Sequence, residues 1–400
     1  MITPSYNITS TERVLPRITL DFTTASLDAR VTLTRALNTA TVINSSGQIA
    51  PINANLPRFD YTLGTGGACR GLLIEETRSN LFLNSVLAGA VAGSPGTAPT
   101  SWIIQFGTGA TTALVTSIYG TLDSAQAIRF SGTSIRMMYA QTLNVTAGQQ
   151  YAFSAYLEAV SGNTGDFMTV TNGTATVAMN TTVTSPQTAG RYTVLFTAST
   201  TGTCTARIGV GTTGATSGAV SATFSRPQVE AGSFSTSYIP TTTTALTRNA
   251  DVATMTGTNF SSWYNAGAGG VVARVLPSTV SGTRPALQFD DATANEVITL
   301  RGITTNPELV IVDGGSPQAQ IDAGTIAANT AYNLGAAWNT NNCAAAVNGN
   351  AAVTDNSATI PTVTQARLGS DGSNYLNGYL QNLRYWPQRI TDAEAQAFSK

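Results

Sequence analysis

Apolar and polar residues alternate with a period of two along most of the chain, which is the pattern of half-buried β-strands. Residues 151–159 show it most clearly, because Tyr151, Phe153, Ala155 and Leu157 would all lie on one face of a strand. Similar runs recur roughly every 8–12 residues, separated by Gly, Asn, Ser and Pro. This spacing is typical of β-sandwiches, so we expect an all-β chain whose strands each bury one face.

Two hairpins and one helix can be placed from local signals. The turn sequence SSGQ predicts a hairpin with Ile43 on the first arm and Ile49 on the second. Residues 344–353 contain Asn-Gly between apolar arms and predict a two-residue hairpin. Thr391 is followed three residues later by Glu394, which matches a capping box and predicts a short C-terminal helix.

Two stretches without a regular pattern divide the chain. Residues 88–102 are rich in Ala, Gly and Pro, and residues 233–248 are rich in hydroxyl side chains. We therefore expect three parts: a β-rich attachment or oligomerisation module at 1–85, a jelly-roll sandwich at 86–242 and a second sandwich at 243–400.

Charge excludes several classes of function. Only 10% of the residues are charged, the net charge is −1 and no basic run occurs. We expect no nucleic-acid partner, because binding to backbone phosphates requires a basic face. We also expect no membrane span, since no run of about 20 apolar residues occurs, and no secretory signal at the N-terminus.

The supply of reactive side chains is also small. The chain contains no histidine, which removes the commonest general base and the commonest metal ligand. Any catalysis would have to use carboxylates, Arg or Tyr. Cys69, Cys204 and Cys343 lie far apart and form no CxxC pair, so we expect three free thiols, no zinc site and assembly in a reducing compartment.

Three passages carry a family resemblance. They are PRFDY with RGLLIEETRSNLFLNS in residues 57–85, QVEAGSFSTSYIPTT with TRNADVATMTG in residues 228–242 and 247–257, and LNGYLQNLRYWPQRITDAEAQAF in residues 376–398. In this order they resemble bacteriophage virion proteins of the tail-fibre, head-fibre or spike-like kind. Those proteins are similar to a carbohydrate-binding-module jelly roll followed by a laminin-G or concanavalin-A-like lectin sandwich.

The resemblance implies a non-enzymatic protein on the virion surface, assembled in the host cytoplasm, that adheres to host surface glycans without a cofactor. Its other partners would be phage structural proteins and further copies of itself, with a trimer favoured by analogy. Two alternatives stay open. One is a head-decoration protein that stabilises the capsid, and the other is a depolymerase that cuts surface polysaccharide with Asp or Glu.

The densest group of charges lies in residues 57–85 and consists of Arg58, Asp60, Arg70, Glu75, Glu76 and Arg78. Arginine and carboxylate side chains form geometrically fixed pairs. We hold two interpretations of this group, which are compatible. It is a virion-attachment interface, or it is an internal network of salt bridges that holds an irregular N-terminal fold.

Other candidates are oxygen-rich and aromatic. The adjacent pairs Glu75-Glu76 and Asp290-Asp291 would point to opposite faces of a strand, so neither forms a catalytic dyad. Residues 289–296 and 369–374 could supply oxygen ligands to calcium, although Asp, Asn and Gly are also ordinary turn residues. Glycans would stack on exposed aromatic side chains, for which we predict Trp263, Tyr264, Tyr375 and Tyr379, whereas Trp338 and Trp386 are predicted to be core.

Overall fold

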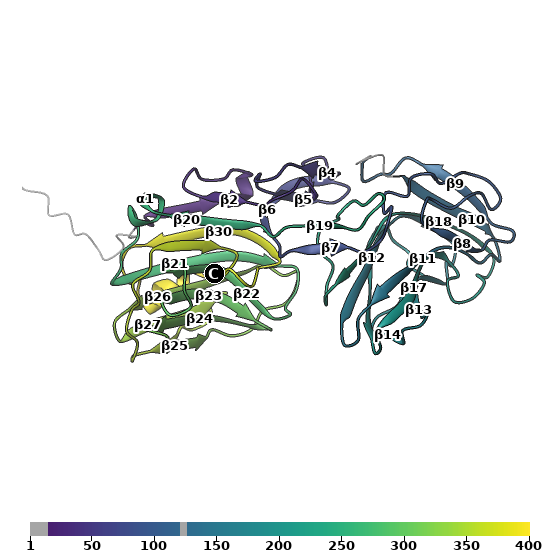
Figure 1. The fold of residues 1–400 in the computed structure, drawn as a ribbon. Coiled ribbons are helices and arrows are strands. Elements are labelled where there is room, and N and C mark those ends of the chain that lie inside the picture. Colours follow the sequence, from purple (N-terminus) through teal and green to yellow (C-terminus); the bar gives the residue numbers. More distant parts are fainter. Residues whose placement is uncertain (1–14, 121–125) are drawn as a thin grey trace, which may run out of the picture. The chain divides into compact units, whose positions relative to one another are not determined.

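The protein is almost entirely β, which confirms the predicted fold class. The computed structural model describes residues 15–120 and 126–400 (Figure 1). The chain divides into two compact units. Unit 1 takes residues up to 33, residues 71–74 and residues 252–400, and unit 2 takes residues 34–70 and 75–251.

This division differs from the three expected parts. The predicted module at 1–85 is no separate unit, because its residues are distributed over both units. Residues 34–70 and 75–85 belong with the predicted jelly roll, and residues 71–74 belong with the C-terminal sandwich. The reason is strand pairing across long stretches of sequence, which boundary signals in a sequence do not reveal.

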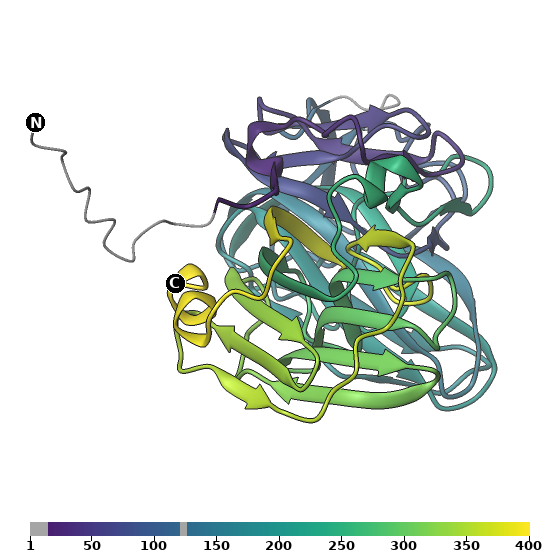
Figure 2. The same cartoon turned by 90° about the vertical axis from the view of Figure 1, so that its left-hand side faces the viewer.

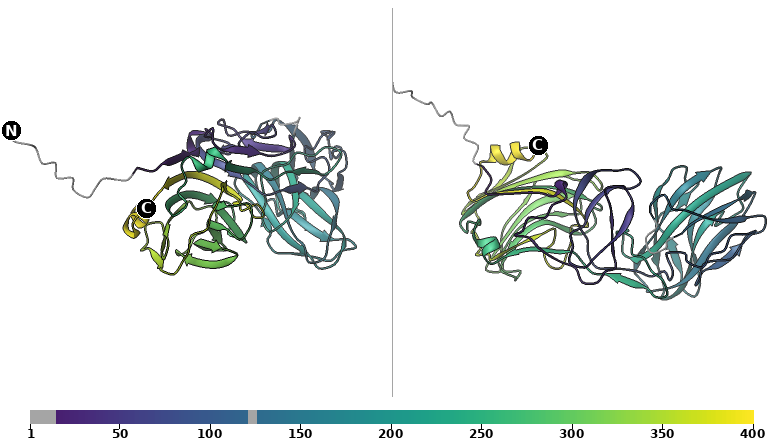
Figure 3. Two further views of the ribbon diagram at one scale, coloured as in Figure 1. Left: turned by 60° about the vertical axis from the view of Figure 1, so that its left-hand side comes forward. Right: turned by 90° about the horizontal axis from the view of Figure 1, so that it is seen from above.

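Unit 1 contains two antiparallel sheets that lie as two curved layers (Figure 3). The first has the order β28-β27-β26-β21-β30, and the far edge of β30 is shared by β1 and β6. Its strands are β1 (Ile18–Asp21), β6 (Gly66–Ile74), β21 (Ala268–Pro277), β26 (Tyr332–Asn339), β27 (Asn342–Val347), β28 (Val353–Asp355) and β30 (Gly378–Trp386). The part of β6 before residue 71 belongs to unit 2.

The second sheet of unit 1 has seven strands in the order β2-β20-β29-β22-β23-β24-β25. They are β2 (Thr32–Thr34), β20 (Val252–Thr256), β22 (Thr283–Asp290), β23 (Val297–Ile303), β24 (Asn306–Asp313), β25 (Ser316–Asp322) and β29 (Gln365–Leu368). Apolar residues of both sheets fill the space between the layers. Phe289 of β22, for example, lies 5.9 Å from Trp338 of β26 and 6.0 Å from Tyr385 of β30, measured between ring centroids.

The described part of unit 1 also contains three short helical segments: η1 (Phe22–Thr24), α1 (Thr258–Ser261) and α2 (Asp392–Phe398). α2 is the predicted C-terminal helix, and its capping box is present, since the Thr391 hydroxyl accepts from the Glu394 amide and the Glu394 carboxylate accepts from the Thr391 amide. The helix packs beside β26 and β27 (Figure 2). No helix among the described residues is long and apolar enough to cross a membrane.

Unit 2 is a second sandwich. Its six-stranded sheet runs β14-β16-β12-β18-β10-β9, and its five-stranded sheet runs β15-β13-β17-β11-β8. The strands of the larger sheet are β9 (Thr111–Val115), β10 (Ala127–Thr133), β12 (Gln150–Ser161), β14 (Val177–Met179), β16 (Gly190–Ala198) and β18 (Ala219–Ala231). Those of the smaller sheet are β8 (Ile103–Phe106), β11 (Met137–Val145), β13 (Asp166–Asn172), β15 (Val183–Thr184) and β17 (Gly202–Val210).

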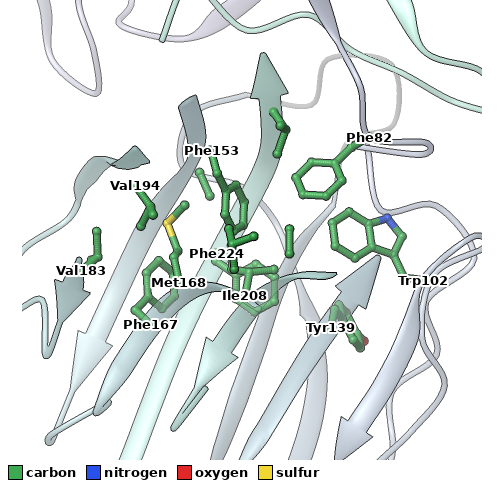
Figure 4. Close-up of a cluster of buried hydrophobic side chains, with 14 of the residues drawn as sticks. Phe82, Trp102, Tyr139, Phe153, Phe167, Met168, Val183, Val194, Ile208 and Phe224 are labelled. Atoms are coloured by element: carbon green, nitrogen blue, oxygen red, sulfur yellow. The ribbon is translucent and has the colours of Figure 1, made fainter. Parts of the chain in front are cut away.

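The core of unit 2 combines aromatic and aliphatic side chains (Figure 4). Phe82 packs against Trp102 and Phe153, with ring centroids 4.7 and 5.3 Å apart. Shorter strand pairs lie around this sandwich: β3 (Ala40–Ile43) with β4 (Ile49–Ile52), β5 (Phe59–Thr62) with the first part of β6, and β7 (Arg78–Asn80) with β19 (Leu246–Arg248).

The strand β12 differs from the prediction of one buried face. Tyr151, Phe153, Ala155 and Leu157 do face the core, but the alternate residues are buried as well. Tyr156 packs with Ile49, Tyr119 and Tyr238 in a separate small cluster. Segments far away in the sequence therefore cover the second face, so the prediction of one buried side is wrong for this strand.

The two predicted hairpins are present, with one difference. Ile43 pairs with Ile49 in the hairpin β3–β4, as expected. At the Asn-Gly turn, Asn348 and Gly349 have φ of 50° and 77°, and the Asn350 amide donates to the Val347 carbonyl at 2.9 Å. This geometry fits the predicted turn, but strand pairing resumes only between residues 345 and 353, so the loop is longer than two residues.

Candidate functional site

The predicted attachment residues lie mostly inside unit 2. Four are buried and two are half-buried; the buried ones are Arg58, Asp60, Glu75 and Arg78, and the half-buried ones are Arg70 and Glu76. Docking on another molecule requires side chains at the surface, so this burial contradicts the interface interpretation for the four buried residues. The internal network, the other interpretation, is what the structure contains.

The centre of this group is a set of five charges that we call the buried ion network: Arg35, Arg58, Glu75, Arg248 and Asp251. Arg58 donates from Nη1 to Glu75 Oε2 at 2.7 Å and from Nη2 to Asp251 Oδ2. Arg35 Nη1 donates to Asp251 Oδ1 at 2.9 Å. Three cations thus share two carboxylates away from water.

The network also holds Glu75 ionised. Burial by itself would raise the pKa of Glu75, but the charges of Arg248 and Arg58 and two hydrogen bonds from Ser237 outweigh burial and lower that pKa. The neighbouring Glu76 is separate, since it pairs with Arg78 at 2.6 Å. Glu75 and Glu76 are therefore each paired with an arginine.

The predicted aromatic platform is largely core. Trp263 and Tyr379 are only 5% and 6% exposed, and Tyr264 stacks on Phe260 at 4.5 Å between ring centroids. Burial raises the pKa of Tyr264. The expectation that Trp263 and Tyr379 are exposed is wrong. Trp263 follows α1 and packs on Phe289 of β22 and Tyr385 of β30, and Tyr379 is a residue of β30 itself. Tyr375 is half-buried; Trp338 and Trp386 are core, as predicted.

The strongest candidate site is a groove of about 560 Å³ on the outer face of the seven-stranded sheet. We call it the β22–β24 groove. Strand register builds it, because Gln288 of β22 lies opposite Arg367 of β29 on one side and opposite Thr299 of β23 on the other. Thr299 in turn lies opposite Val310 of β24. Since side chains alternate between faces, these four residues point away from the core together.

The floor of the β22–β24 groove is apolar. Val297, Val310 and Val312 lie there, and the first two are almost completely recessed. Residues of the same strands that face the core, such as Ile298 and Ile311, are buried in the sandwich. The sheet therefore carries a second, smaller apolar surface on its outer side.

Two arginines bring polar atoms to this apolar floor. Arg367 donates through Nε to Asp290 Oδ2 at 2.8 Å, and Arg301 donates through Nε to Glu308 Oε1 at 2.8 Å. Both carboxylates are buried, whereas the two arginines are 20% and 25% exposed. Neither arginine has a hydrogen bond from its Nη atoms to any residue that the structure describes. Each pair thus fixes a planar guanidinium whose terminal donors remain available.

The two loops singled out as oxygen-rich both reach this groove. Ala292, Thr293 and Ala294 come from the first loop, and residues 371–374 from the second. Asp371 shapes the second loop, because its carboxylate accepts from the amides of Ser373 and Asn374 at 2.8 and 2.6 Å. Within residues 15–120 and 126–400, no three acidic or cysteine side chains cluster as a metal site would require.

The carboxylates of the groove are poorly placed for proton transfer. Asp290 accepts from Gln288, Gln365, Arg367 and the Ala292 amide, so both of its oxygens are occupied. Asp371, the other carboxylate in the lining, accepts from the Ser373 and Asn374 amides and from the Asn374 side chain. Asp291 lies beside the groove and is half-buried, and its hydrogen bonds from the Thr293 hydroxyl and amide lower its pKa. The arrangement suits the binding of a ligand with an apolar face and hydroxyl groups better than it suits acid–base chemistry.

Comparisons with known proteins give limited information. No family model matches the chain, and no curated protein matches it in sequence. Among solved structures it is similar to the carbohydrate-binding module CBM40 of the Ruminococcus gnavus IT-sialidase bound to α2,3-sialyllactose, with 12% identity and a TM-score of 0.30 over 34% of this chain and 84% of that one.

Two further structures match larger parts of the chain. Mouse laminin α1 domains LG4-5 match at 12% identity and a TM-score of 0.24, over 63% of this chain and 87% of that one. Trypanosoma rangeli sialidase with the inhibitor DANA matches at 10% identity and a TM-score of 0.27, over 88% of this chain and 63% of that one. Similarity at this level identifies no family and no ligand, so function has to rest on the groove itself.

Proposed function

We propose that the chain is a non-enzymatic adhesion protein that binds surface glycans in the β22–β24 groove. The observation that carries the proposal is the combination of an apolar floor, Val310 and its neighbours, with two fixed guanidinium groups at its rim. Sugars present the same combination, since a pyranose ring has an apolar C–H face bordered by hydroxyl groups.

The geometry also sets the expected strength of binding. The groove is open to solvent at the arginines, and none of the described residues that line it is aromatic, so a single site gains little apolar contact. Small ligands with few polar contacts bind weakly, and several linked copies raise the overall avidity by factors of about 10²–10⁴. We therefore propose an oligomer as the binding form, with a trimer favoured by analogy with the fibre proteins that the sequence resembles.

The biological setting of the proposal comes from the sequence resemblance to phage fibre and spike proteins. We propose that the protein is displayed on the virion surface together with phage structural proteins and adheres to host glycans. Its lack of histidine and the occupied oxygens of Asp290 support a binding role over catalysis.

A glycan array probed with the intact chain tests the proposal. The variant Arg367→Lys keeps the positive charge next to Asp290 but removes the planar fork, so binding to the selected glycan should weaken about 3–10-fold through the loss of one or two hydrogen bonds. The matched control is Arg129→Lys, an exposed arginine of unit 2, which should bind as the unmodified chain does.

Two results would contradict the proposal. Equal binding by the two variants, with unchanged thermal midpoints, would place the glycan elsewhere. Incubation with host envelope polysaccharide tests catalysis, because sustained release of new reducing ends that stops on replacing one Asp or Glu would show a depolymerase instead.

A further inference from the structure

A second groove lies on the outer face of the other sheet of unit 1. Helix α2 covers one part of that face, where Ala395 and Phe398 pack with Val272, Ala337 and Trp386. Next to this covered part is a groove of about 440 Å³, which we call the β21–β30 groove. Its polar lining includes Thr23, Arg274, Asn333, Gln381, Arg384 and Lys400.

The charge of this groove is unusual for the chain. Three cations, Arg274, Arg384 and Lys400, line it together with one carboxylate, that of Asp21. Asp21 is already engaged, because its Oδ1 accepts from the amide and the hydroxyl of Thr23 at 3.0 and 2.6 Å. The side chains that line the groove thus carry an excess of two positive charges, in a chain whose net charge is −1.

Neutral groups, not carboxylates, orient the two arginines. Arg274 donates from Nε to Gln381 Oε1 at 3.0 Å and from Nη1 to Asn333 Oδ1 at 3.4 Å. Arg384 donates from Nη2 to the Phe398 carbonyl at 3.0 Å, and its guanidinium lies 5.7 Å from the centroid of the Trp386 ring. None of the three cations forms an ion pair with a residue in the described part of the chain.

The two grooves differ in this respect. In the β22–β24 groove, Arg301 and Arg367 are each neutralised by a buried carboxylate. In the β21–β30 groove, Arg274 and Arg384 lie on neighbouring antiparallel strands, with Arg274 opposite Asn382 and Val272 opposite Arg384. Unneutralised arginines on neighbouring strands are complementary to a planar or tetrahedral anion, because guanidinium groups donate paired hydrogen bonds to such an anion.

We infer that the β21–β30 groove is a second binding site, and that it takes the carboxylate or sulfate group of an acidic glycan. The arginines and Lys400 bind the anionic group, and the amide of Asn382, which also lines the groove, is placed to contact a neighbouring hydroxyl. The inference does not depend on glycan binding in the first groove.

Calorimetric titration of the intact chain tests the inference. The probes are tetragalacturonate for the carboxylate, a sulfated heparin tetrasaccharide for the sulfate, and maltotetraose as the neutral comparison. We expect at least one acidic probe to bind more tightly than maltotetraose and to weaken as salt is raised. The acidic probe that binds identifies the anionic group.

Variants assign the binding to the groove. Arg274→Gln should weaken the acidic probe about tenfold through the loss of a charge-assisted hydrogen bond, and the double variant Arg274→Gln with Lys400→Gln should weaken it further. The matched control is Arg129→Gln. The Lys400 side chain is exposed and forms no hydrogen bond with a residue of 15–120 or 126–400, so Lys400→Gln tests the charge alone even if Arg274→Gln lowers the thermal midpoint.

Three results would overturn the inference. The first is the absence of binding by either acidic probe, and the second is unchanged acidic binding in the double variant. The third is that Arg367→Lys no longer binds the acidic probe whereas Arg274→Gln binds it as the unmodified chain does, because that result would assign the anion to the β22–β24 groove. If only the proposal for the β22–β24 groove is wrong, the chain will bind the acidic probe but not maltotetraose.

Discussion

Replacing Asp251 by Asn is the sharpest test of how unit 2 is stabilised. The Asp251 carboxylate accepts from Arg35 Nη1 and the Glu75 amide at 2.9 and 3.0 Å, and also from two nitrogens of Arg58. Asparagine has nearly the same shape but no charge, and one of its two terminal groups donates instead of accepting. The variant therefore leaves Arg35, Arg58 and Arg248 around one remaining carboxylate, that of Glu75.

The expected cost is large because all three arginine side chains are completely buried. Removing one partner of a buried ion pair typically lowers the free energy of unfolding by about 3–5 kcal/mol. With a urea m value of about 3 kcal/mol/M, the unfolding midpoint of unit 2 would fall by about 1–1.7 M.

The chain contains a separate probe for each unit. Cys204 lies in β17 of unit 2 and Cys343 in β27 of unit 1, and both are buried free thiols. Burial raises the pKa of each to about 11. Thiol labelling at increasing urea, followed by peptide mass spectrometry, therefore reports the unfolding of the two units individually, which a single spectroscopic signal does not.

The control and the refuting result follow from the same assay. Asp166→Asn is the matched control in unit 2, since Asp166 is half-exposed and accepts from the hydroxyls of Thr184 and Thr213. Its cost should stay below about 1 kcal/mol. If Asp251→Asn shifts the Cys204 midpoint by no more than this control, the network does not stabilise unit 2 and the reasoning fails.

Two further predictions use the same thiol assay. Arg248, Arg58 and Ser237 lower the pKa of Glu75 in the folded state, against the effect of burial. The ionised Glu75 therefore contributes fully to the free energy of unfolding above its unfolded pKa of about 4.3, and this contribution is lost as the pH falls below that value. The Cys204 urea midpoint should thus fall between about pH 5 and pH 3; it is read with a dipyridyl disulfide, because ordinary alkylating reagents need the thiolate. Glu75→Gln should show a smaller fall, and an equal fall in both proteins would assign the acid sensitivity to other carboxylates. Thr391→Ala removes the capping box of α2 and should cost about 1 kcal/mol, which lowers the Cys343 midpoint and leaves that of Cys204 unchanged; an unmoved Cys343 midpoint would show that α2 does not support β27.

Local features could be predicted from the sequence because their causes are local. The capping box at Thr391, the pairing of Ile43 with Ile49 and the Asn348-Gly349 turn each depend on a few adjacent residues. The all-β class followed from strand periodicity. The second buried face of β12 could not be predicted, because the residues that cover Tyr156, such as Ile49 and Tyr238, come from distant segments.

Only part of the candidate site could be predicted from the sequence. Residues 289–296 and 369–374 were singled out as oxygen-rich, and both border the β22–β24 groove. The row of Arg367, Gln288, Thr299 and Val310 could not be found, because it depends on the register of four strands. A sequence also does not show which aromatic residues are exposed, which is why Trp263 was placed on the surface although it is core.

A crystal structure of the intact chain with the oligosaccharide selected on the glycan array tests the central claim most directly. We predict that one sugar ring lies over Val310, with hydroxyl groups bonded to the Nη atoms of Arg367 or Arg301. Electron density for the sugar away from the β22–β24 groove, or an empty groove at a saturating ligand concentration, would contradict the claim.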